Sequence, residues 1–514
     1  MKTTLLRIGL SLLITTYSIG QNWEWIKTAG GGGPDLLAGG IAVNKKGEIF
    51  IAGHVVMGCI YSPNCLGYSD IFIAKYDKDG NFLWAKRAGS VDNQPWVAND
   101  AADGIGCDED GNAYLVCDMK GQSPTFDTIV FPNATSSKFF LAKYSPNGKC
   151  LWARYTYGAY VYSISASKNS VFVSSVGNIG NFFVRYRSKD GSEHWKKSII
   201  NGYVVNFITD GKDNCFLSGV YNDSTTIDTI VLKGGYTFIA KLDSSGNVVW
   251  AKNSTGGYLI FDKGSLYSVG TFKNTLNICN QQLISSGSYD ILLSRYDENG
   301  NCKWVKTIGG TGNEVPKSYN SLNNSFVGYG GGVMILARSN ASYSLETCEV
   351  NLPDSGAYIL KIDSNGICQN VKILPNIFNN GCIGADTSQN VYLAGDYWTP
   401  LAFDSFTITP TSNPTDIFIA KLNTNVTNVP EQNNKSGWFF NIYPNPSDGT
   451  YHLDISVSLL PAQLEIYDAL GKNIFHTTIS QENTFLNIPE FAKGVYLFKV
   501  ISSNGNTFQQ KIIR

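Results

Sequence analysis

The chain has 514 residues, enough for roughly two to four domains of about 100–200 residues each. Glycine is abundant at 52 residues, aromatic residues make up 13% and charged residues only 16%, a composition that favours many short strands joined by turns over helices. There are 40 Lys and Arg against 41 Asp and Glu, so no excess of positive charge is present to neutralise nucleic-acid phosphates. We therefore expect an all-β globular protein with no nucleic acid among its partners.

The first 20 residues have the pattern of a secretory signal peptide. Lys2 and Arg7 precede a short apolar run, which ends in small residues at Gly20. We predict a signal peptide over residues 1–20, with cleavage between Gly20 and Gln21. The alternative is an uncleaved anchor, but the run is shorter than the ~20 residues that cross a bilayer. No later stretch is apolar enough to cross, so we expect no transmembrane segment in the mature chain.

A repeated hairpin runs through most of the chain. Apolar and polar residues alternate on its two arms, which flank a turn of the type Asp-x-Asp/Asn-Gly. A second hairpin, such as Gly40–Gly53, precedes each copy, so one unit holds four antiparallel strands, the pattern of a β-propeller blade. The clear copies of the repeat are Ile71–Gly89, Phe139–Gly158, Phe238–Gly256 and Ile291–Gly309, and the weaker ones are Phe182–Asn201 and Tyr358–Asn376.

A large aromatic ring marks the fourth strand of almost every unit, and we interpret it as an anchor between neighbouring blades. The last unit has three strands, ending in Ile417–Leu422, while Asn22–Ala29 is a lone fourth strand at the other end. We predict a seven-bladed β-propeller over residues 21–425, closed by the N-terminal strand; six or eight blades are the alternatives. The anchors are Trp25, Trp84, Trp152, Trp195, Trp250 and Trp304, with Asn370 in the seventh place.

Strand order predicts that all tight turns lie on one rim of the propeller and all long connections on the other. Long loops on a rigid scaffold commonly bind ligands, and several of these carry aromatic residues. They form a candidate ligand face for a sugar or peptide, with loop residues folded over the blades as the alternative. These residues are Tyr61, Tyr68, Trp96, Tyr397 and Trp398.

Acidic residues recur at two positions of the repeat. Asp70, Asp290 and Asp416 each precede a third strand; they either bind a cation or ligand together or accept hydrogen bonds from loop amides separately, and we favour the second reading. The turns Asp77–Gly80 and Asp297–Gly300 place glycine fourth, too early for a calcium loop. We interpret these as hairpin turns.

Signs of catalysis are sparse. The four histidines, His54, His194, His452 and His476, have no spacing typical of a zinc site or a nucleophilic triad. We predict no catalytic residue, no metal ligand and no cofactor. Paired carboxylates for glycoside hydrolysis remain open, because their approach is spatial and not sequential.

Eleven cysteines leave at least one without a partner inside the chain. Cys59 and Cys65 either close a small disulfide ring or pack separately. Cys150, Cys302 and Cys368 occupy the same repeat position and alternate with core positions, so we expect them to pack as small hydrophobic residues.

The repeats resemble those of Bacteroidota-type surface and secreted β-propeller proteins over residues 21–425, which implies a fold more than an activity. The segment Ala74–Trp84 is also similar to the tryptophan-docking motif of quinoprotein dehydrogenases, although the sequence has no vicinal cysteine pair. Ser188–Trp195 approaches the sialidase Asp-box, with its glycine one place early.

After a polar linker, residues 426–437, four separated motifs resemble the type A sorting domain of the type IX secretion system, over residues 438–514. Alternating residues in this segment predict a small Ig-like β-sandwich; a plain accessory domain of that kind is the alternative. The resemblance implies export, recognition by the outer-membrane translocation and attachment machinery, and removal of the domain. The motif residues are Tyr443, Pro444, Asn445, Pro446, Gly449, Gly471, Lys472, Gly494, Tyr496 and Lys511.

Together these features predict a secreted or cell-surface β-propeller that acts as a binding or adhesion module for a glycan or protein. The alternative is a propeller enzyme, either glycoside-active or quinone-dependent. A third hypothesis is a structural role in surface or gliding machinery.

Overall fold

The structure is a computed structural model with two compact units, one spanning Asn22–Thr424 and the other containing the residues after Thr424. Both consist of strands, and in the described residues the one helical element is the single 3₁₀ turn η1 (Val457–Leu459). This confirms the all-β prediction. The described residues are 22–30, 34–56, 69–91, 100–132, 138–156, 160–177, 180–316, 325–345, 347–352, 356–375, 379–404, 406–411, 415–424, 440–443, 449–468, 471–503 and 507–514.

The described part of the first unit holds seven sheets, each built on four antiparallel strands, which we number in chain order. Sheet 1 comprises β2 (Asp35–Val43), β3 (Ile49–Val56), β4 (Ser69–Tyr76) and β5 (Phe82–Val91). Sheet 2 comprises β6 (Ala101–Cys107), β7 (Ala113–Met119), β10 (Lys138–Tyr144) and β11 (Cys150–Tyr155). Sheet 3 comprises β12 (Tyr160–Ala166), β13 (Ser170–Gly177), β14 (Gly180–Arg187) and β15 (Glu193–Ser198).

Sheets 4 to 7 repeat the same order. Sheet 4 comprises β16 (Ile200–Thr209), β17 (Cys215–Ile227), β19 (Thr237–Leu242) and β20 (Val248–Asn253), and sheet 5 comprises β21 (Tyr258–Asp262), β22 (Ser265–Phe272), β25 (Asp290–Tyr296) and β26 (Cys302–Ile308). Sheet 6 comprises β28 (Phe326–Tyr329), β29 (Gly332–Ser339), β32 (Gly356–Ile362) and β33 (Cys368–Ile373), and β27 (Val315–Pro316) also pairs with β29. Sheet 7 comprises β34 (Asn379–Ala385), β35 (Val391–Tyr397), β38 (Asp416–Leu422) and β1 (Trp23–Ala29).

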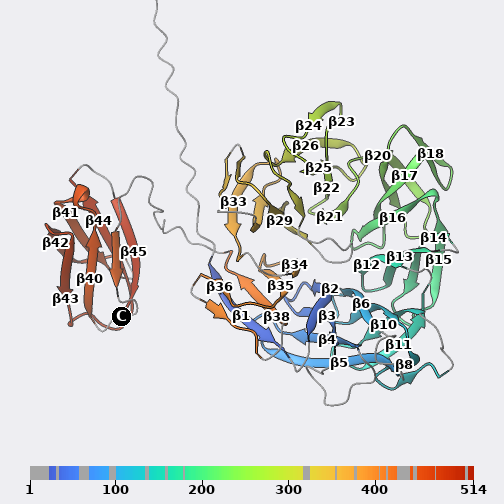
Figure 1. The fold of residues 1–514 in the computed structure, drawn as a ribbon, viewed down its shortest axis with the longest axis horizontal. Helices are drawn as coiled ribbons and strands as arrows, with labels where there is room; N and C mark the ends of the chain where they lie inside the picture. The colour runs from blue at the N-terminus through green and yellow to red at the C-terminus, as the bar shows by residue number, and fades with distance from the viewer. Residues whose placement is uncertain are drawn as a thin grey trace, which may run out of the picture. The chain divides into compact units, whose positions relative to one another are not determined.

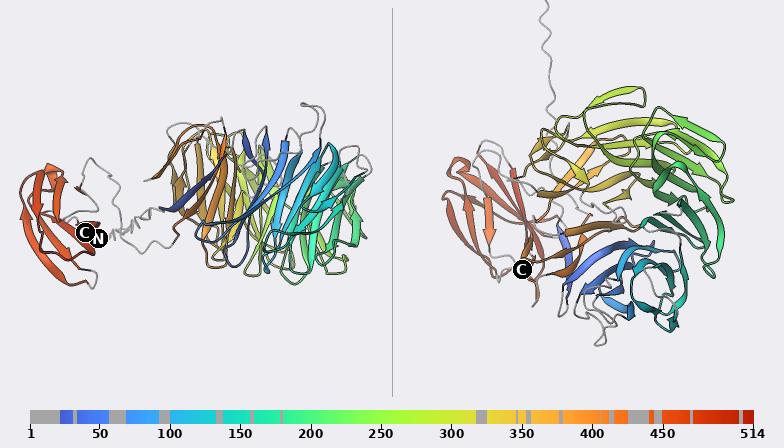
Figure 2. Two further views of the ribbon diagram at one scale, coloured as in Figure 1. Left: turned by 90° about the horizontal axis from the view of Figure 1, so that it is seen from below. Right: turned by 45° about the vertical axis from the view of Figure 1, so that its right-hand side comes forward.

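The first strands of the seven sheets contact one another in a closed series, β2–β6–β12–β16–β21–β28–β34 and back to β2. Figure 1 shows these strands toward the middle of the unit and the fourth strands, such as β5, β11 and β20, at its outside. Seen edge-on in Figure 2, the strands run between two rims. The arrangement is β-propeller-like.

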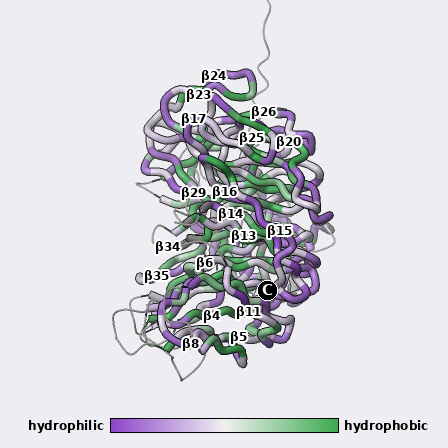
Figure 3. Tube along the Cα trace, turned by 90° about the vertical axis from the view of Figure 1, so that its right-hand side faces the viewer, coloured by the Kyte–Doolittle hydropathy of each residue, from purple (hydrophilic) through white to green (hydrophobic). Residues whose placement is uncertain are grey.

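Burial follows strand position within each sheet. All eight residues of β4 are buried, whereas β15 at the outside is mostly exposed. A middle strand has sheet neighbours on both sides and packed sheets on both faces, so both of its side-chain rows leave water. In Figure 3 the hydrophilic stretch at β15 contrasts with the hydrophobic inner strands.

The predicted closure of the last sheet is confirmed. β1 pairs antiparallel with β38, from the far end of the unit's sequence, with Ala29 opposite Ile417 and Trp25 opposite Lys421. The backbone N–H of Asn423 donates to the carbonyl of Asn22 at 2.8 Å, which extends the pairing by one bond. Without β1, the strand β38 would present an open hydrogen-bonding edge.

The long connections are more ordered than expected. In five sheets the connection between the second and third strands forms a small extra hairpin, which we call the accessory hairpin. The sequence analysis treated these segments as loops. The hairpins are β8 (Gln122–Phe126) with β9 (Ile129–Val130), the end of β17 with β18 (Ile230–Lys233), β23 (Thr275–Ile278) with β24 (Gln281–Ile284), β30 (Tyr343–Ser344) with β31 (Glu349–Val350), and β36 (Leu401–Phe403) with β37 (Phe406–Ile408).

The second unit consists of two sheets around one hydrophobic core, to which Tyr451, Leu464 and Phe498 contribute. One sheet has the order β39–β40–β43, the other β42–β41–β44–β45. The strands are β39 (Phe440–Tyr443), β40 (Thr450–Ile455), β41 (Ala462–Tyr467), β42 (Asn473–Ile479), β43 (Asn483–Asn487), β44 (Val495–Ser502) and β45 (Thr507–Ile513).

Candidate functional site

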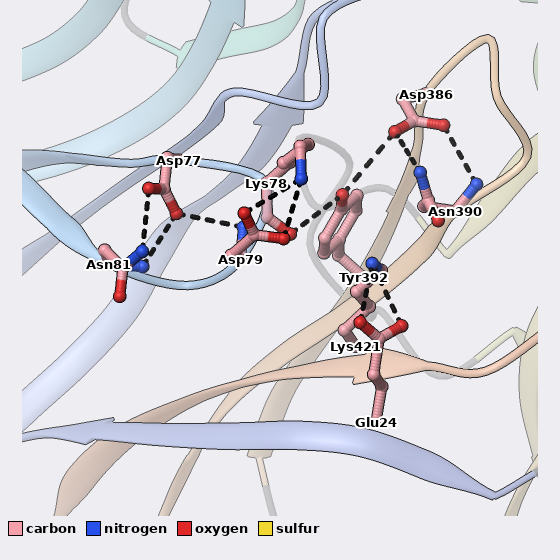
Figure 4. Close-up of polar contacts among 9 residues, drawn as sticks. All are labelled: Glu24, Asp77, Lys78, Asp79, Asn81, Asp386, Asn390, Tyr392 and Lys421. Carbon is pink, nitrogen blue, oxygen red and sulfur yellow. Dashed lines mark hydrogen bonds and ion pairs between the residues drawn. The ribbon is translucent and has the colours of Figure 1, made fainter.

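Several tight turns are stabilised by hydrogen bonds to the carboxylate of their own first residue. Asp77 Oδ1 accepts hydrogen bonds from the backbone N–H groups of Asp79 and Asn81, at 2.9 and 2.8 Å, and Asn81 Nδ2 donates to Oδ2 at 2.9 Å (Figure 4). Burial acts to raise the pKa of Asp77, but these hydrogen bonds outweigh it and hold the pKa below its ordinary value. The turns are therefore hairpin turns, as predicted, and Asp108, Asp210, Asp243, Asp297 and Asp386 repeat the pattern.

Each tryptophan of a fourth strand lies on the turn of the next sheet. A Cβ on Gly148 would stand 2.8 Å from the ring of Trp84, and one on Gly191 would stand 2.7 Å from the ring of Trp152. Both glycines have positive φ, +80° and +69°, so the turn is shaped for glycine and the ring fills the place of its side chain. The structure places Trp25, Trp195, Trp250 and Trp304 in the same way on Gly80, Gly246, Gly300 and Gly366.

Hydrogen bonds from the indole N–H groups to the same turns stabilise this contact. Trp84 Nε1 donates to the carbonyl of Pro146 at 2.8 Å, and Trp152 Nε1 donates to that of Ser188 at 3.1 Å. Trp195, Trp250 and Trp304 bind the equivalent carbonyls of Ser244, Glu298 and Ser364.

A cation beside each tryptophan was missed by the sequence analysis. Lys143 lies on the third strand, opposite Trp152 of the fourth strand. Its Nζ donates to the Ser188 carbonyl, which also accepts from Trp152, at 3.0 Å and lies 5.3 Å from the centroid of the Tyr114 ring. Burial lowers the pKa of Lys143. The signal was the basic residue in every copy of the third strand: Lys75, Lys143, Arg185, Lys241, Arg295, Lys361 and Lys421.

At the closure this pattern changes, as Figure 4 shows. The hydroxyl of Tyr392 donates to the carbonyl of Lys78 at 3.4 Å, in the place that an indole N–H takes elsewhere. Lys421 forms an ion pair with Glu24 at 2.9 Å, joining β38 to β1. Tyr392 and Trp25 have ring centroids 6.1 Å apart.

The structure describes two of the five residues of the predicted ligand face, Tyr397 and Trp398. Tyr397 is fully buried, with its ring 6.0 Å from that of Phe418, so the prediction that it faces a ligand is wrong. Tyr397 is the last residue of β35 and follows the inward row of that strand, which places it in the core. Trp398, one residue on, is 42% exposed. Tyr61, Tyr68 and Trp96 lie outside the described residues.

The rim of long connections carries buried acids that bind loop amides. Asp290 accepts from the backbone N–H of Ser286, and Asp416 from that of Thr411, at 2.9 and 2.8 Å. This supports the favoured reading that these acids act separately. Asp70, the equivalent residue of sheet 1, is 1% exposed and lies 3.7 Å from Arg87.

A second set of acids on this rim also accepts hydrogen bonds from backbone amides. Asp100 accepts from the backbone N–H of Ser90 at 2.5 Å and from that of Lys120 at 2.8 Å, and Glu314 accepts from that of Gly310 at 3.0 Å. Burial raises the pKa of Asp100 to about 6. Burial and the nearby Asp118 raise the pKa of Asp103 to about 7.

The two histidines of the first unit lie in different environments. Burial lowers the pKa of His54 to about 4, whereas His194 lies on the exposed outer strand β15. In the residues that the structure describes, no group of three or more His, Cys, Asp or Glu could hold a metal ion.

The cysteine expectation needs correction. Cys302 bonds to Cys279 and Cys368 to Cys348, each pair with Cα atoms 5.9 Å apart. Both partners lie in accessory hairpins, whose position the sequence analysis did not foresee. Cys150 alone of its set is a free, buried thiol, as expected. Cys59 and Cys65 are outside the described part of the chain.

In the second unit the predicted motif residues shape turns and strand ends. Gly449 has a φ of +110°, and a Cβ there would stand 3.1 Å from Arg514 Nε. Gly494 exchanges two backbone hydrogen bonds with Arg514. Tyr496 is buried and donates to the carbonyl of Ala492 at 2.7 Å.

The remaining motif residues mark turns and strands. Gly471 has a φ of +80° in the turn before β42, and the backbone N–H of Lys472 donates to Asp468 at 3.0 Å. Tyr443 ends β39 and Lys511 lies in β45. Pro444, Asn445 and Pro446 lie outside the described residues, as do the predicted cleavage position at Gly20 and Gln21 and the linker 426–437.

Comparison with known families decides the nature of the second unit. Residues 441–514 match the family described as "Secretion system C-terminal sorting domain". The C-terminal unit is a type IX sorting domain. The protein is therefore secreted or displayed on the outer surface, and its sorting domain interacts with the type IX machinery. No helix among the described residues is long and apolar enough to cross a membrane.

Solved structures are similar at low identity, and no curated protein matches the chain. Quinohemoprotein alcohol dehydrogenase from Comamonas testosteroni has a TM-score of 0.37 at 9% identity, over 80% of this chain and 78% of that one. The extracellular domain of a hybrid two-component system from B. thetaiotaomicron has a TM-score of 0.38 at 10% identity, over 96% and 60%. An N11 neuraminidase-like protein of a flat-faced bat influenza A virus has a TM-score of 0.34 at 9% identity, over 66% and 92%.

Proposed function

We propose that the mature protein is a seven-bladed β-propeller that binds a glycan or a protein at the outer surface, without catalysis and without a cofactor. Seven four-stranded sheets, the closed series of first strands and the pairing of β1 with β38 support the blade count. We assign the C-terminal sandwich to the Ig-like class, and the signal peptide to residues 1–20, as parts of the same proposal.

The state of the rim acids is the observation that carries this proposal. A general acid or base must reach the substrate within hydrogen-bond distance. Asp100, Asp290, Glu314 and Asp416 are each 1% exposed or less, and each accepts a hydrogen bond from a loop amide. These carboxylates hold the long connections in place, which favours a rigid binding platform over a catalytic site.

Export and surface exposure can be tested in the native host by cell fractionation with intact-mass analysis. We expect the full chain to reach the surface or the medium without residues 1–20. We expect a chain lacking residues 441–514 to accumulate in the periplasm. Surface delivery of the truncated chain would contradict the assigned role of the sorting domain.

Catalysis is tested on the purified mature chain. Incubation with polysaccharides, followed by reducing-end measurement, is expected to show no turnover above a heat-inactivated control. Reproducible turnover, or the absorbance of a bound quinone, would overturn the binding-module proposal in favour of an enzyme.

A further inference from the structure

Three tyrosines gather at the starts of neighbouring first strands, on the rim of long connections. Tyr162, Tyr203 and Tyr258 belong to β12, β16 and β21, in three successive sheets. The rings of Tyr162 and Tyr203 have centroids 5.3 Å apart. Burial, together with the neighbouring Tyr162, raises the pKa of Tyr258 to about 12. We call these three residues the tyrosine arc; each is partly exposed.

Polar side chains hold the arc in place. Asn206 Nδ2 donates to Ser163 Oγ at 3.2 Å, and Asn206 Oδ1 accepts from the backbone N–H of Leu259 at 2.9 Å, so one amide joins β12, β16 and β21. Asn181 Nδ2 donates to the carbonyl of Gly202 at 2.9 Å, next to Tyr203. Phe326 supports Tyr258 from the next sheet, with ring centroids 5.2 Å apart. Such pre-organised rings lose little conformational freedom on binding.

The chain segments that carry the arc have no charged residues. The segments 156–166, 199–209 and 253–261 contain no Asp, Glu, Lys or Arg and are rich in Ser, Thr, Asn and Gly. Sheets 7, 1 and 2 differ sharply, because their part of the same rim holds Asp35, Asp70, Asp100, Asp103, Asp396 and Asp416. Most of the rim's buried acids thus lie in sheets 7, 1 and 2. Asp290 and Glu314, at sheets 5 and 6, accept hydrogen bonds from loop amides, and the segments that begin the first strands of sheets 3 to 5 carry no charge.

We propose that the tyrosine arc binds a neutral saccharide, an inference that rests on the proposed binding function. An aromatic ring can bury the apolar C–H face of a sugar, while phenol and amide groups pair with its hydroxyls. A charged ligand would leave its charge without a counter-charge at the contact, which costs free energy. The arc therefore selects against anionic polysaccharides and charged peptides.

The test uses the mature full chain, residues 21–514, in affinity electrophoresis and calorimetry with neutral dextran, mannan, xylan and β-glucan, and with the charged polymers alginate and chitosan. We expect at least one neutral polymer to bind. Tyr162→Leu and Tyr203→Leu are expected to weaken this binding 10-fold or more. Tyr258→Phe keeps the ring, removes only the hydroxyl, and is expected to weaken binding several-fold.

Tyr236→Leu is the matched control, since Tyr236 lies in the connection between β18 and β19, is 78% exposed, and is outside the arc. This variant should bind as the parent does, and circular dichroism with thermal melts should show that each variant is folded. Because Tyr258→Phe is nearly isosteric, it reports on the site even where a leucine variant unfolds.

Three results would overturn the inference: no binding of any neutral polymer, binding of charged polymers alone, or equal binding by the parent and all folded arc variants. Binding of a purified envelope protein without any neutral polymer would reject the saccharide and leave the binding function standing. Turnover of a polymer would reject the binding function itself.

Discussion

Gly148 shows how one residue can tie two sheets together. Its φ of +80° is strained for any residue with a side chain, and the Trp84 ring occupies the space that a Cβ would need. Gly211 has a similar φ of +75°, yet nothing lies within 4 Å of its Cβ position. A substitution at Gly211 therefore measures the cost of backbone strain alone, whereas the same substitution at Gly148 also measures the loss of the ring contact.

We expect Gly148→Ala to destabilise the protein more than Gly211→Ala. Both variants lose about 1 kcal/mol to the left-handed backbone, and Gly148→Ala loses about 1–3 kcal/mol more because the methyl group displaces the indole. Urea unfolding followed by tryptophan fluorescence measures the difference. Equal losses would show that the ring contact contributes nothing.

The buried carboxyl of Asp103 makes stability depend on pH. Its folded pKa of about 7 lies above the ordinary value of 3.8, so between these values the unfolded chain releases a proton that the folded chain keeps. The free energy of unfolding contributed by this group therefore falls as pH rises from about 4 to 7.

Asp103→Asn should remove this fall. We expect the variant to match the parent near pH 4, where the carboxyl is neutral in the folded chain, and to be more stable by about 1–3 kcal/mol at pH 8. Denaturant titrations at both pH values test this. A variant less stable than the parent at pH 8 would show that the carboxylate is bound favourably.

At the scale of elements, the accessory hairpins fasten the long connections to the outer strands. Phe126 of β8 packs on Phe140 of β10 with ring centroids 5.2 Å apart, and β8 also pairs with β5 of the preceding sheet. Disulfides add to this fastening in sheets 5 and 6.

Cys302→Ser and Cys150→Ser compare a bonded cysteine with a free one at equivalent places. Loss of the Cys279–Cys302 bond, which spans 23 residues, should cost about 2–4 kcal/mol. Cys150→Ser, which places a hydroxyl in a buried site, should cost only about 1–2 kcal/mol. Unfolding in the presence of a reductant should erase most of the parent's advantage over Cys302→Ser; an unchanged difference would contradict this account.

Closure by the N-terminal strand governs the first unit as a whole. Asn370 occupies the seventh anchor position, facing sheet 7, where the third strand β38 and the fourth strand β1 have no turn between them. An indole there would have no turn glycine to cover. The missing tryptophan and the chain break at the closure are thus one feature of the ring.

A mature chain that begins at residue 31 should lose this closure. It leaves the edge of β38 open, so we expect early protease cleavage and aggregation in light scattering. A synthetic peptide of residues 21–30, added during refolding, should restore resistance, whereas the same peptide with Ile26→Pro should not, because proline cannot continue the ladder opposite Ala420. Full resistance without any peptide would contradict the role of β1.

The sequence by itself determined the strands, the hairpin turns, the tryptophan anchors, the partner of β1 and the sorting domain. Each of these is written in local spacing: alternation along a strand, glycine at a fixed turn position, or motifs in a fixed order. A single sequence displays such patterns directly.

Only the tertiary structure decided which side chains meet across sheets. The pairs Cys279–Cys302 and Cys348–Cys368, the buried place of Tyr397 and the meeting of Tyr162 with Tyr203 depend on residues that are distant in the chain or on which face of a strand turns inward. Position in a repeat says which strand a residue is on. It does not say what the curvature of the ring brings against it, and that contact decides between a core ring, a disulfide and a binding surface.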